Sequence, residues 1–167
     1  MKIMKIITVL VYFALVSCNI YSFSGASITN DVKSFSVDYI NSQATNSPSS
    51  LNQSITENLQ TLILNQTNLS LKEKSIADLN FKGTIIKYDI KPIAITSNET
   101  TAQNRLTINL KLEYTNNKNK DLNYNTTFTR YRDFDSSINF SDVELVLIEE
   151  ITKELAEDIF NKAFVNW

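Results

Sequence analysis

The sequence predicts an α+β fold: a two-layer sandwich in which two helices pack on one face of a mainly antiparallel four-stranded sheet. Two observations lead to this expectation. Four segments alternate apolar and polar side chains with the period of a half-buried strand, and two segments repeat apolar side chains at helical spacing. Their order along the chain is β-α-β-β-β-α. Because each element hides one apolar face, stacking both helices on one side of the sheet buries all of these faces.

The first strand and the first helix are expected between residues 32 and 65. Residues 32–40 alternate apolar and polar side chains, as in a half-buried strand. After a polar loop, Ser50 followed three residues later by Gln53 predicts a capping box at the start of a helix. The apolar stripe of that helix consists of Leu51, Ile55, Leu59, Leu62 and Ile63.

The second strand is expected to be long and irregular, and the third to be regular. Residues 79–93 have an apolar phase that changes at Ile85-Ile86. A β-bulge produces such a one-residue shift, and the nearby Gly83 fits a bend. Residues 104–114 alternate throughout, which predicts one core face and one wet face.

A fourth strand and a long final helix complete the expected fold. A polar hairpin turn at residues 116–121 leads into a strand at residues 122–131, in which Leu122, Tyr124 and Phe128 share one face.

Ser141 and Glu144 then predict a second capping box, ahead of the final helix. Asp133 and Asp135 are interpreted as turn and helix-approach residues, because further ligands of a metal site are missing. The stripe of the helix is Val143, Leu147, Ile148, Ile151, Leu155, Ile159 and Ala163. Three aromatic residues near the edge of that stripe are expected to cover a second surface: Phe160, Phe164 and Trp167.

The composition excludes most enzyme chemistry. The chain has no histidine and one cysteine, so neither a Ser-His-Asp triad nor a Cys-His pair nor a Cys/His zinc site can form. Two glycines cannot build a glycine-rich phosphate loop. With 16 basic and 18 acidic residues and no basic cluster, nothing indicates a nucleic-acid partner. We therefore expect no enzyme, no metal and no cofactor of the dissociable kind.

The N-terminus has the layout of an export signal. Lys2 and Lys5 precede an uncharged apolar run from Ile6 to Leu15, which is short for a bilayer span. The run ends in Leu15-Val16-Ser17-Cys18, which resembles the lipobox of bacterial lipoproteins. The alternatives are an ordinary secretory signal with a stray cysteine and a signal anchor.

The resemblance to a lipobox implies a maturation step at Cys18. In bacterial lipoproteins the thiol takes a diacylglycerol, the preceding peptide is removed, and the new amino group receives an N-acyl lipid. Residues 1–17 are therefore expected to be a signal peptide that is removed, residues 18–31 a lipidated lead-in, and residues 32–167 a single domain.

Several motifs of the mature chain resemble one family. They are Ile20–Gly25 after the cysteine, Asp78–Ile85 running on to Tyr88 and Pro92, Asn104–Ile108, Tyr131–Asp135, and a final helix that ends at Trp167. Together they resemble the LptE-like lipoproteins of the Bacteroidota. The resemblance implies a non-enzymatic protein that plugs an LptD-like outer-membrane β-barrel and helps to assemble it. Its partners would be that barrel, the lipopolysaccharide that the barrel moves to the cell surface, and the membrane that holds its lipid anchor.

The resemblance also implies contacts with the glycolipid. In relatives these contacts are attributed to basic residues, and the candidates here are Lys82, Lys87, Arg105 and Lys111. Cations of this kind would attract the phosphates of lipid A. The alternative is that Lys and Arg alternate on an exposed strand face only to keep it soluble.

The lead-in supplies the remaining expectations. Tyr21 and Phe23 are candidates for contact with the barrel or the membrane interface, or they close the end of the domain's own core. Residues 19–30 carry no charge, whereas surface-exposed lipoproteins of the Bacteroidota are expected to carry an acidic patch there. The periplasmic side of the outer membrane is therefore the expected location. The alternative function is a free-standing periplasmic lipoprotein that binds a small ligand or envelope component in an apolar cleft.

Overall fold

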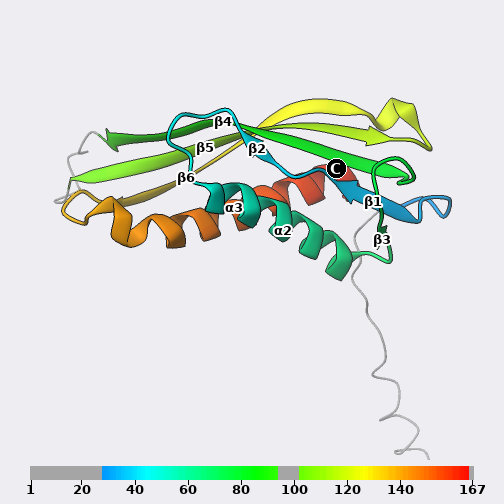
Figure 1. Ribbon diagram of the computed structural model, residues 1–167, viewed down its shortest axis with the longest axis horizontal. Helices are drawn as coiled ribbons and strands as arrows, with labels where there is room; N and C mark the ends of the chain where they lie inside the picture. The colour runs from blue at the N-terminus through cyan, green and yellow to red at the C-terminus, as the bar shows by residue number, and fades with distance from the viewer. Residues whose placement is uncertain (1–27, 94–101, 166–167) are drawn as a thin grey trace, which may run out of the picture.

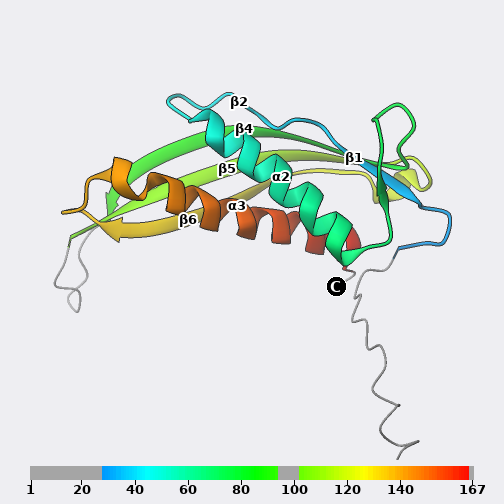
Figure 2. The same cartoon turned by 60° about the horizontal axis from the view of Figure 1, so that its bottom comes forward.

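The computed structural model describes residues 28–93 and 102–165, and in these ranges it forms two layers. Both helices cover one face of a long twisted sheet and leave the other face open (Figure 1). Figure 2, in which the helices come forward, shows α2 crossing in front of the strands next to α3. In chain order the elements are β1 (Ser34–Val37), β2 (Asn41–Ser42), α2 (Ser49–Gln66), β3 (Ser70–Leu71), β4 (Leu79–Ile93), β5 (Gln103–Asn116), the 3-10 turn η1 (Lys120–Leu122), β6 (Tyr124–Asp135) and α3 (Phe140–Phe164).

The expectation of a four-stranded, mainly antiparallel sheet is wrong in two respects. Over the described residues the sheet has six strands, in the order β3-β1-β4-β5-β6, with β2 also paired to β4. It is also mixed, because β1 and β2 run parallel to β4 and β3 runs parallel to β1, while β4, β5 and β6 are antiparallel. The parallel pairing follows from α2, which returns the chain to the end of the sheet where β1 began.

The long central pair β4–β5 contains the predicted bulge. The pairing runs from Leu79 opposite Asn116 to Ile93 opposite Gln103, and its register shifts between Ile85 and Lys87. The extra residue changes the side on which the following residues of β4 point. Ile85 and Tyr88 therefore both pack toward the helices although they are three positions apart, and the bulge prediction is confirmed.

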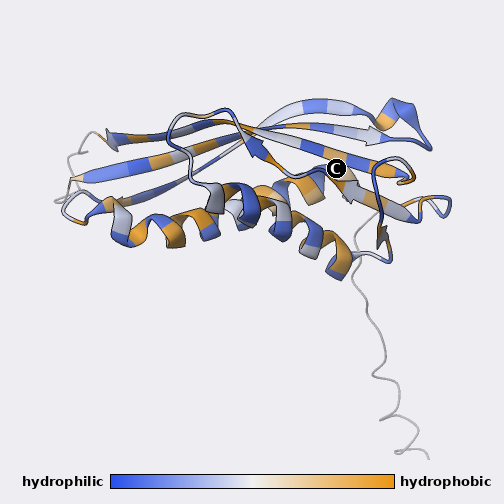
Figure 3. Cartoon of the chain, in the orientation of Figure 1, coloured by the Kyte–Doolittle hydropathy of each residue, from blue (hydrophilic) through white to orange (hydrophobic). Residues whose placement is uncertain are grey.

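The core fills the space between the sheet and the two helices. Figure 3 shows hydrophobic and hydrophilic residues alternating along the strands, which sends one set toward the helices and the other away from them. The predicted stripes of both helices are largely buried, and Phe35, Phe81 and Leu110 are fully buried between the layers. Phe160 and Phe164 are also part of this core, so the expectation that they cover a second surface is wrong, while Trp167 lies outside the described residues.

Gly83 is required by close packing and not by its backbone conformation. Its φ is not positive. A Cβ atom at this position would lie 2.9 Å from Cγ1 of Ile40, which itself is fully buried. The missing side chain therefore lets Ile40 pack directly on the backbone of β4.

Neither predicted capping box forms. In α2 the cap position is Pro48, which makes no side-chain cap hydrogen bond, and Gln53 donates to Glu57 instead. In α3 the cap position is Asn139, again without a side-chain cap hydrogen bond. Glu144 accepts a hydrogen bond from the Tyr88 hydroxyl at 2.5 Å, so this carboxylate ties the first turns of α3 to β4.

The fourth predicted strand is longer than expected and begins later. β6 continues to Asp135, so Asp133 and Asp135 belong to a strand and not to a turn. Leu122 lies before the strand and is 50% exposed, which contradicts its expected place beside Tyr124 and Phe128. A paired edge strand can carry charged residues where its side chains find partners across the sheet.

Candidate functional site

The face of the sheet that the helices leave uncovered is the candidate site, and we call it the open face. It is formed by side chains of β4, β5 and β6 that point away from the core. The register places polar side chains in rows across the three strands, such as Lys82, Glu113 and Asn125. The open face comprises Lys82, Thr84, Lys87, Asp89 and Lys91 of β4, Arg105, Thr107, Asn109, Lys111 and Glu113 of β5, and Asn125, Thr127, Thr129, Tyr131 and Asp133 of β6.

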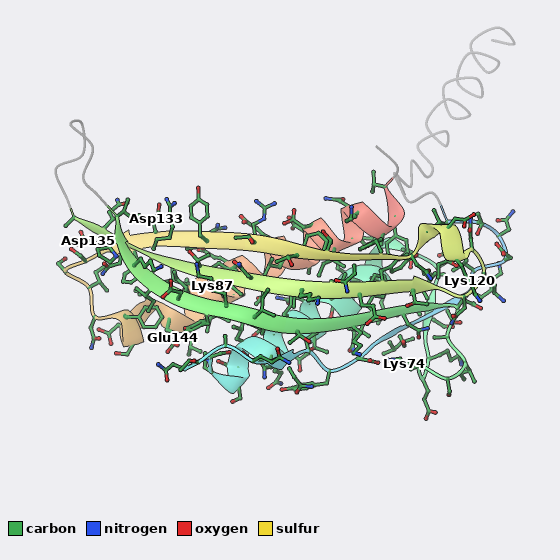
Figure 4. The ribbon with its side chains drawn as sticks, turned by 90° about the horizontal axis from the view of Figure 1, so that it is seen from above. Lys74, Lys87, Lys120, Asp133, Asp135 and Glu144 are labelled. Atoms are coloured by element: carbon green, nitrogen blue, oxygen red, sulfur yellow. The ribbon has the colours of Figure 1, made fainter. Side chains whose placement is uncertain are left out.

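The structure brings all four predicted cations onto the open face. Lys82 lies 3.8 Å from Glu113, and both side chains are exposed; Lys87 lies 3.8 Å from Asp89, and both of these are partly exposed. Exposed pairs at this separation contribute about 0–1 kcal/mol and open easily. Figure 4 looks down on this face and shows Lys87 among its side chains.

Arg105 differs from the three lysines because its side chain is already engaged. Its Nε and Nη2 donate to the two oxygens of Asp133 at 2.7 and 2.8 Å. Its guanidinium also lies over the ring of Tyr131, 3.8 Å from the ring centre. The Asp133 carboxylate raises the pKa of Arg105 above its ordinary value. A bidentate, stacked pair holds an arginine more firmly than a single exposed contact does.

A hollow of about 190 Å³ lies toward the end of the open face that is nearest to η1. Lys82 and Lys111 both border it, from neighbouring strands, and Gln43, Thr84, Ile86, Glu113 and Asn125 complete its lining. Within residues 28–93 and 102–165 no carboxylate lies within 4.0 Å of the Lys111 amine. Among the described residues, Lys111 therefore has no carboxylate partner, and Lys82 has only the weakly held Glu113.

Asn109 lies one residue pair away along β5 and adds an acceptor. Its side-chain oxygen is buried and has no hydrogen-bond partner among the described residues. Its register neighbours are Lys87 on β4 and Thr129 on β6. The alternation of residues 104–114 places Asn109 on the wet face, but only the register shows that it lies between candidate cations.

Two other hollows are larger and lie elsewhere. One of about 310 Å³ lies where the chain enters the fold, with a largely polar lining that includes Thr29, Lys33 and Asn68. Another of about 280 Å³ lies between the outer sides of α2 and α3, lined by residues such as Asn58 and Glu157. Both are open to solvent, so neither resembles an enclosed apolar ligand site.

The helix side of β6 carries an ionic ladder that the sequence analysis missed. Arg130 donates to Asp158 of α3, with Nε 2.6 Å from Oδ2. Arg132 pairs with Glu150, with Nε 2.7 Å from Oε2, and also with Glu154. These contacts fasten α3 beneath the edge of the sheet. The signal in the sequence was two arginines two residues apart, opposite three acids spaced by four residues on α3.

Asp78 fastens the N-terminal segment to the start of β4. Its Oδ2 accepts hydrogen bonds from Lys33 N at 2.9 Å, Ser34 N at 3.0 Å and Ser34 Oγ at 2.9 Å. Lys118 lies 3.0 Å from its other oxygen. The backbone hydrogen bond from Lys33 is the largest cause that lowers the pKa of Asp78 to about 2. The carboxylate form therefore stabilises the folded state.

Asp78→Asn should lower the free energy of unfolding by about 2 kcal/mol at pH 7, because the pKa shift corresponds to that energy. In the unfolded chain the Asp78 carboxylate is protonated near its ordinary pKa of 3.8, whereas in the folded protein its pKa is about 2. The contribution is thus complete above pH 4 and is lost as the pH falls toward 2. Urea denaturation of both proteins from pH 7 to pH 2 checks this.

The difference between wild type and Asp78→Asn should shrink across that window. Asp121→Asn, on an exposed residue of η1, is the control and should match the wild type at every pH. A constant difference from pH 7 to pH 2 would show that the amide, and not the lost charge, is responsible.

The lipidation site and the two aromatic contact candidates lie outside the described residues. This holds for Cys18, Tyr21 and Phe23. Within the described ranges, no helix is long and apolar enough to cross a membrane. The same ranges hold no group of three or more acidic, cysteine or histidine side chains placed to bind a metal ion.

Comparison with solved structures finds the same fold in distant proteins. The chain is similar to a Helicobacter pylori homologue of the neuraminyllactose-binding hemagglutinin, at a TM-score of 0.57 and 11% identity, over 86% of this chain and 89% of that one. It is also similar to a protein of Xanthomonas campestris, at a TM-score of 0.52 and 9% identity, over 77% of this chain and 81% of that one. At such identities the likeness shows the fold alone. No curated protein sequence matches the chain.

The family comparison covers nearly the whole described structure. A family model described as "LptE: Lipopolysaccharide-assembly" matches residues 32–163, from just before β1 to the last turn of α3. The chain therefore belongs to the LptE family of lipopolysaccharide-assembly proteins, which are not enzymes.

Proposed function

We propose that the protein is a lipoprotein of the outer membrane that plugs an LptD-type β-barrel and helps to assemble it. The role in lipopolysaccharide assembly follows from the family, and the observation that carries the plug is the match over residues 32–163. The filled core supports it, because the alternative of a free-standing ligand binder requires a concave apolar cavity. The three hollows described above are open to solvent, and each has a lining that mixes polar and apolar side chains.

The anchor is part of the same proposal. Cys18 carries the diacylglycerol and the N-acyl lipid, and the uncharged residues 19–30 keep the protein on the periplasmic side. The resemblance of the motifs to those of the Bacteroidota supports an origin in that group. Tyr21 and Phe23, next to the lipid, contact the barrel or the membrane interface.

Lys82 and Lys111 are the proposed contacts with the phosphates of the glycolipid. They border one hollow on the open face, and neither is held by a strong ion pair among the described residues. Lys87 is the next cation along β4 and has an equally weak partner. Arg105 would have to give up its bidentate pair with Asp133, so it ranks behind the lysines. A phosphate gains charge-assisted hydrogen bonds from such donors.

Reversing the two charges at the hollow tests this assignment. Lys82→Glu combined with Lys111→Glu should weaken the binding of purified protein to immobilised lipopolysaccharide by about tenfold or more, because two charge-assisted contacts are lost. Lys72→Glu combined with Lys120→Glu is the matched control, since both lysines are exposed and lie off the open face. Equal binding by wild type and the Lys82/Lys111 variant would show that the hollow does not bind the phosphates of the glycolipid. Equal losses in both variants would show that only net charge matters.

A further inference from the structure

The sheet ends in a long strand with a free edge. β6 has twelve residues and pairs with β5 on one side, and no strand of the described residues lies on its other side. The opposite end of the sheet is the two-residue β3. A long unpaired edge is a place where an extended segment of another chain can add as a further strand.

The ladder shows which backbone groups of β6 point away from the sheet. In an antiparallel pair, alternate residues direct both their N–H and their C=O toward the partner strand. Ser136 N donates to Ala102 O at 3.0 Å, continuing the register in which Asp135 lies opposite Gln103. Even-numbered residues of β6 therefore bond to β5. Odd-numbered residues direct their backbone groups outward, and Arg132 Nη1 donates to the outward carbonyl of Tyr131 at 3.0 Å.

The C-terminal half of this edge is protected. The Tyr131 carbonyl is taken by Arg132, and the Asp135 carbonyl accepts from Ile138 N at 3.1 Å. Asp133 and Asp135 also bring charge to this half, and an incoming strand would have to cover it. Charged residues on an edge strand discourage pairing.

The N-terminal half, Asn125–Thr129, has no such protection, and we call it the free half. None of its five residues is charged, and Asn125, Thr127 and Thr129 are exposed. Because odd-numbered residues of β6 direct their backbone groups away from β5, these three residues present six backbone N–H and C=O groups at the free edge. Figure 4 shows α3 emerging beyond β6, so a strand added here would lie over the helix as the existing strands do.

We propose that the free half pairs with an extended, uncharged segment of the barrel partner, which adds to the sheet as a seventh strand. This rests on the proposed function. The segment comes from a loop or a terminal arm, because the wall of a closed barrel has no unpaired strand edges to offer. Main-chain hydrogen bonds to Asn125, Thr127 and Thr129 supply the affinity.

The side chains next to the free half determine which residues the added segment would carry. On the open face its neighbours are the Asn and Thr side chains of the free half, which favour small polar residues. On the helix side its neighbours are the half-buried Tyr124 and Phe128, which favour apolar residues. The ion pairs of Arg130 with Asp158 and Glu154 are complete, so a charge placed beside Phe128 would be desolvated without a new partner. Lys162 lies over the Tyr124 ring, at the start of the free half. An uncharged segment with alternating polarity matches this edge.

Thr127→Pro tests the edge directly. The Thr127 N–H points away from β5, so proline removes one edge donor and places its ring in the path of an added strand without breaking the existing ladder. Thr127→Val keeps the N–H and the strand preference and is the matched control. Each full-length protein is expressed in its own host and recovered from gently solubilised outer membranes, and the barrel recovered per lipoprotein is quantified by mass spectrometry. Wild type and the valine variant should retain the barrel equally, and the proline variant about fivefold less or worse.

Two results would overturn the inference in distinguishable ways. If wild type retains the barrel and Thr127→Pro retains it equally, the edge pairing is wrong and the plug stands. If wild type retains no barrel, both fail.

If the Thr127→Pro protein does not fold, a photo-crosslinking residue placed at Thr129 tests the edge pairing instead. Crosslinks to a barrel-protein segment outside the barrel wall support the pairing. Crosslinks to the wall, to a second copy of this chain, or to nothing contradict it.

Discussion

Leu110→Asp should abolish folding. Leu110 is fully buried at the middle of β5, where it lies opposite Ile85 of β4 and Phe128 of β6. A carboxylate here would have apolar neighbours on both sides and no cation within its row. Burying an unpaired ionisable group and losing the leucine together cost about 5 kcal/mol or more. Since domains are stable by only about 5–15 kcal/mol, most of the folded population should be lost.

Urea denaturation followed by circular dichroism checks this expectation. Lys111→Asp is the matched control, because it introduces the same carboxylate one residue away, at an exposed position of the open face opposite Thr84. The control should unfold cooperatively within about 1 kcal/mol of the wild type. A cooperative transition of the Leu110→Asp protein near that of the wild type would show that the faces of β5 are reversed.

Cys18→Ala should abolish lipid attachment and release the protein from the membrane. Lipidation requires the thiol, and the chain contains no other cysteine. Each buried methylene of an acyl chain contributes about 0.8 kcal/mol to membrane binding, so losing all the chains removes the anchor. The expected product has an unacylated mass and leaves the detergent-rich phase on phase partitioning.

Ser17→Ala is the control for Cys18→Ala. Alanine is also a small residue and it leaves Cys18 in place, so this protein should be lipidated normally. An unchanged mass and membrane fraction in the Cys18→Ala protein would identify the N-terminus as an ordinary signal or a signal anchor.

The parts of the fold that the sequence predicted are those set by local periodicity. The strict alternation of residues 104–114 placed Leu110 in the core, and the phase change at Ile85-Ile86 located the bulge. The direction of β1 was predicted wrongly, since whether two strands run parallel depends on the path of the helix between them. The two-residue strands β2 and β3 are too short to show any period.

The same distinction holds for the candidate site: the local pattern predicted which side chains are exposed, but not which side chains they pair with. Alternation, with the phase change at Ile85-Ile86, put Lys82, Lys87, Arg105 and Lys111 on the wet faces of the two middle strands, and the register brings them together on the open face. Their partners depend on cross-strand register, which the sequence does not reveal. Asp133, interpreted as a turn residue, turned out to hold Arg105. The capping boxes fail because both helices begin before the predicted cap serines, at Ser49 and Phe140. Gln53 then bonds to Glu57 within α2, and Glu144 bonds to Tyr88 of β4.

Quantitative co-purification tests the central claim most directly. The full-length protein with a C-terminal tag is expressed in its own host, outer membranes are solubilised gently, and the bound proteins are identified and counted by mass spectrometry. The account predicts a large LptD-like barrel in a near-equal amount to the lipoprotein. Recovery of the lipoprotein alone, in good yield and acylated at Cys18, would contradict the plug and favour a free-standing periplasmic binder.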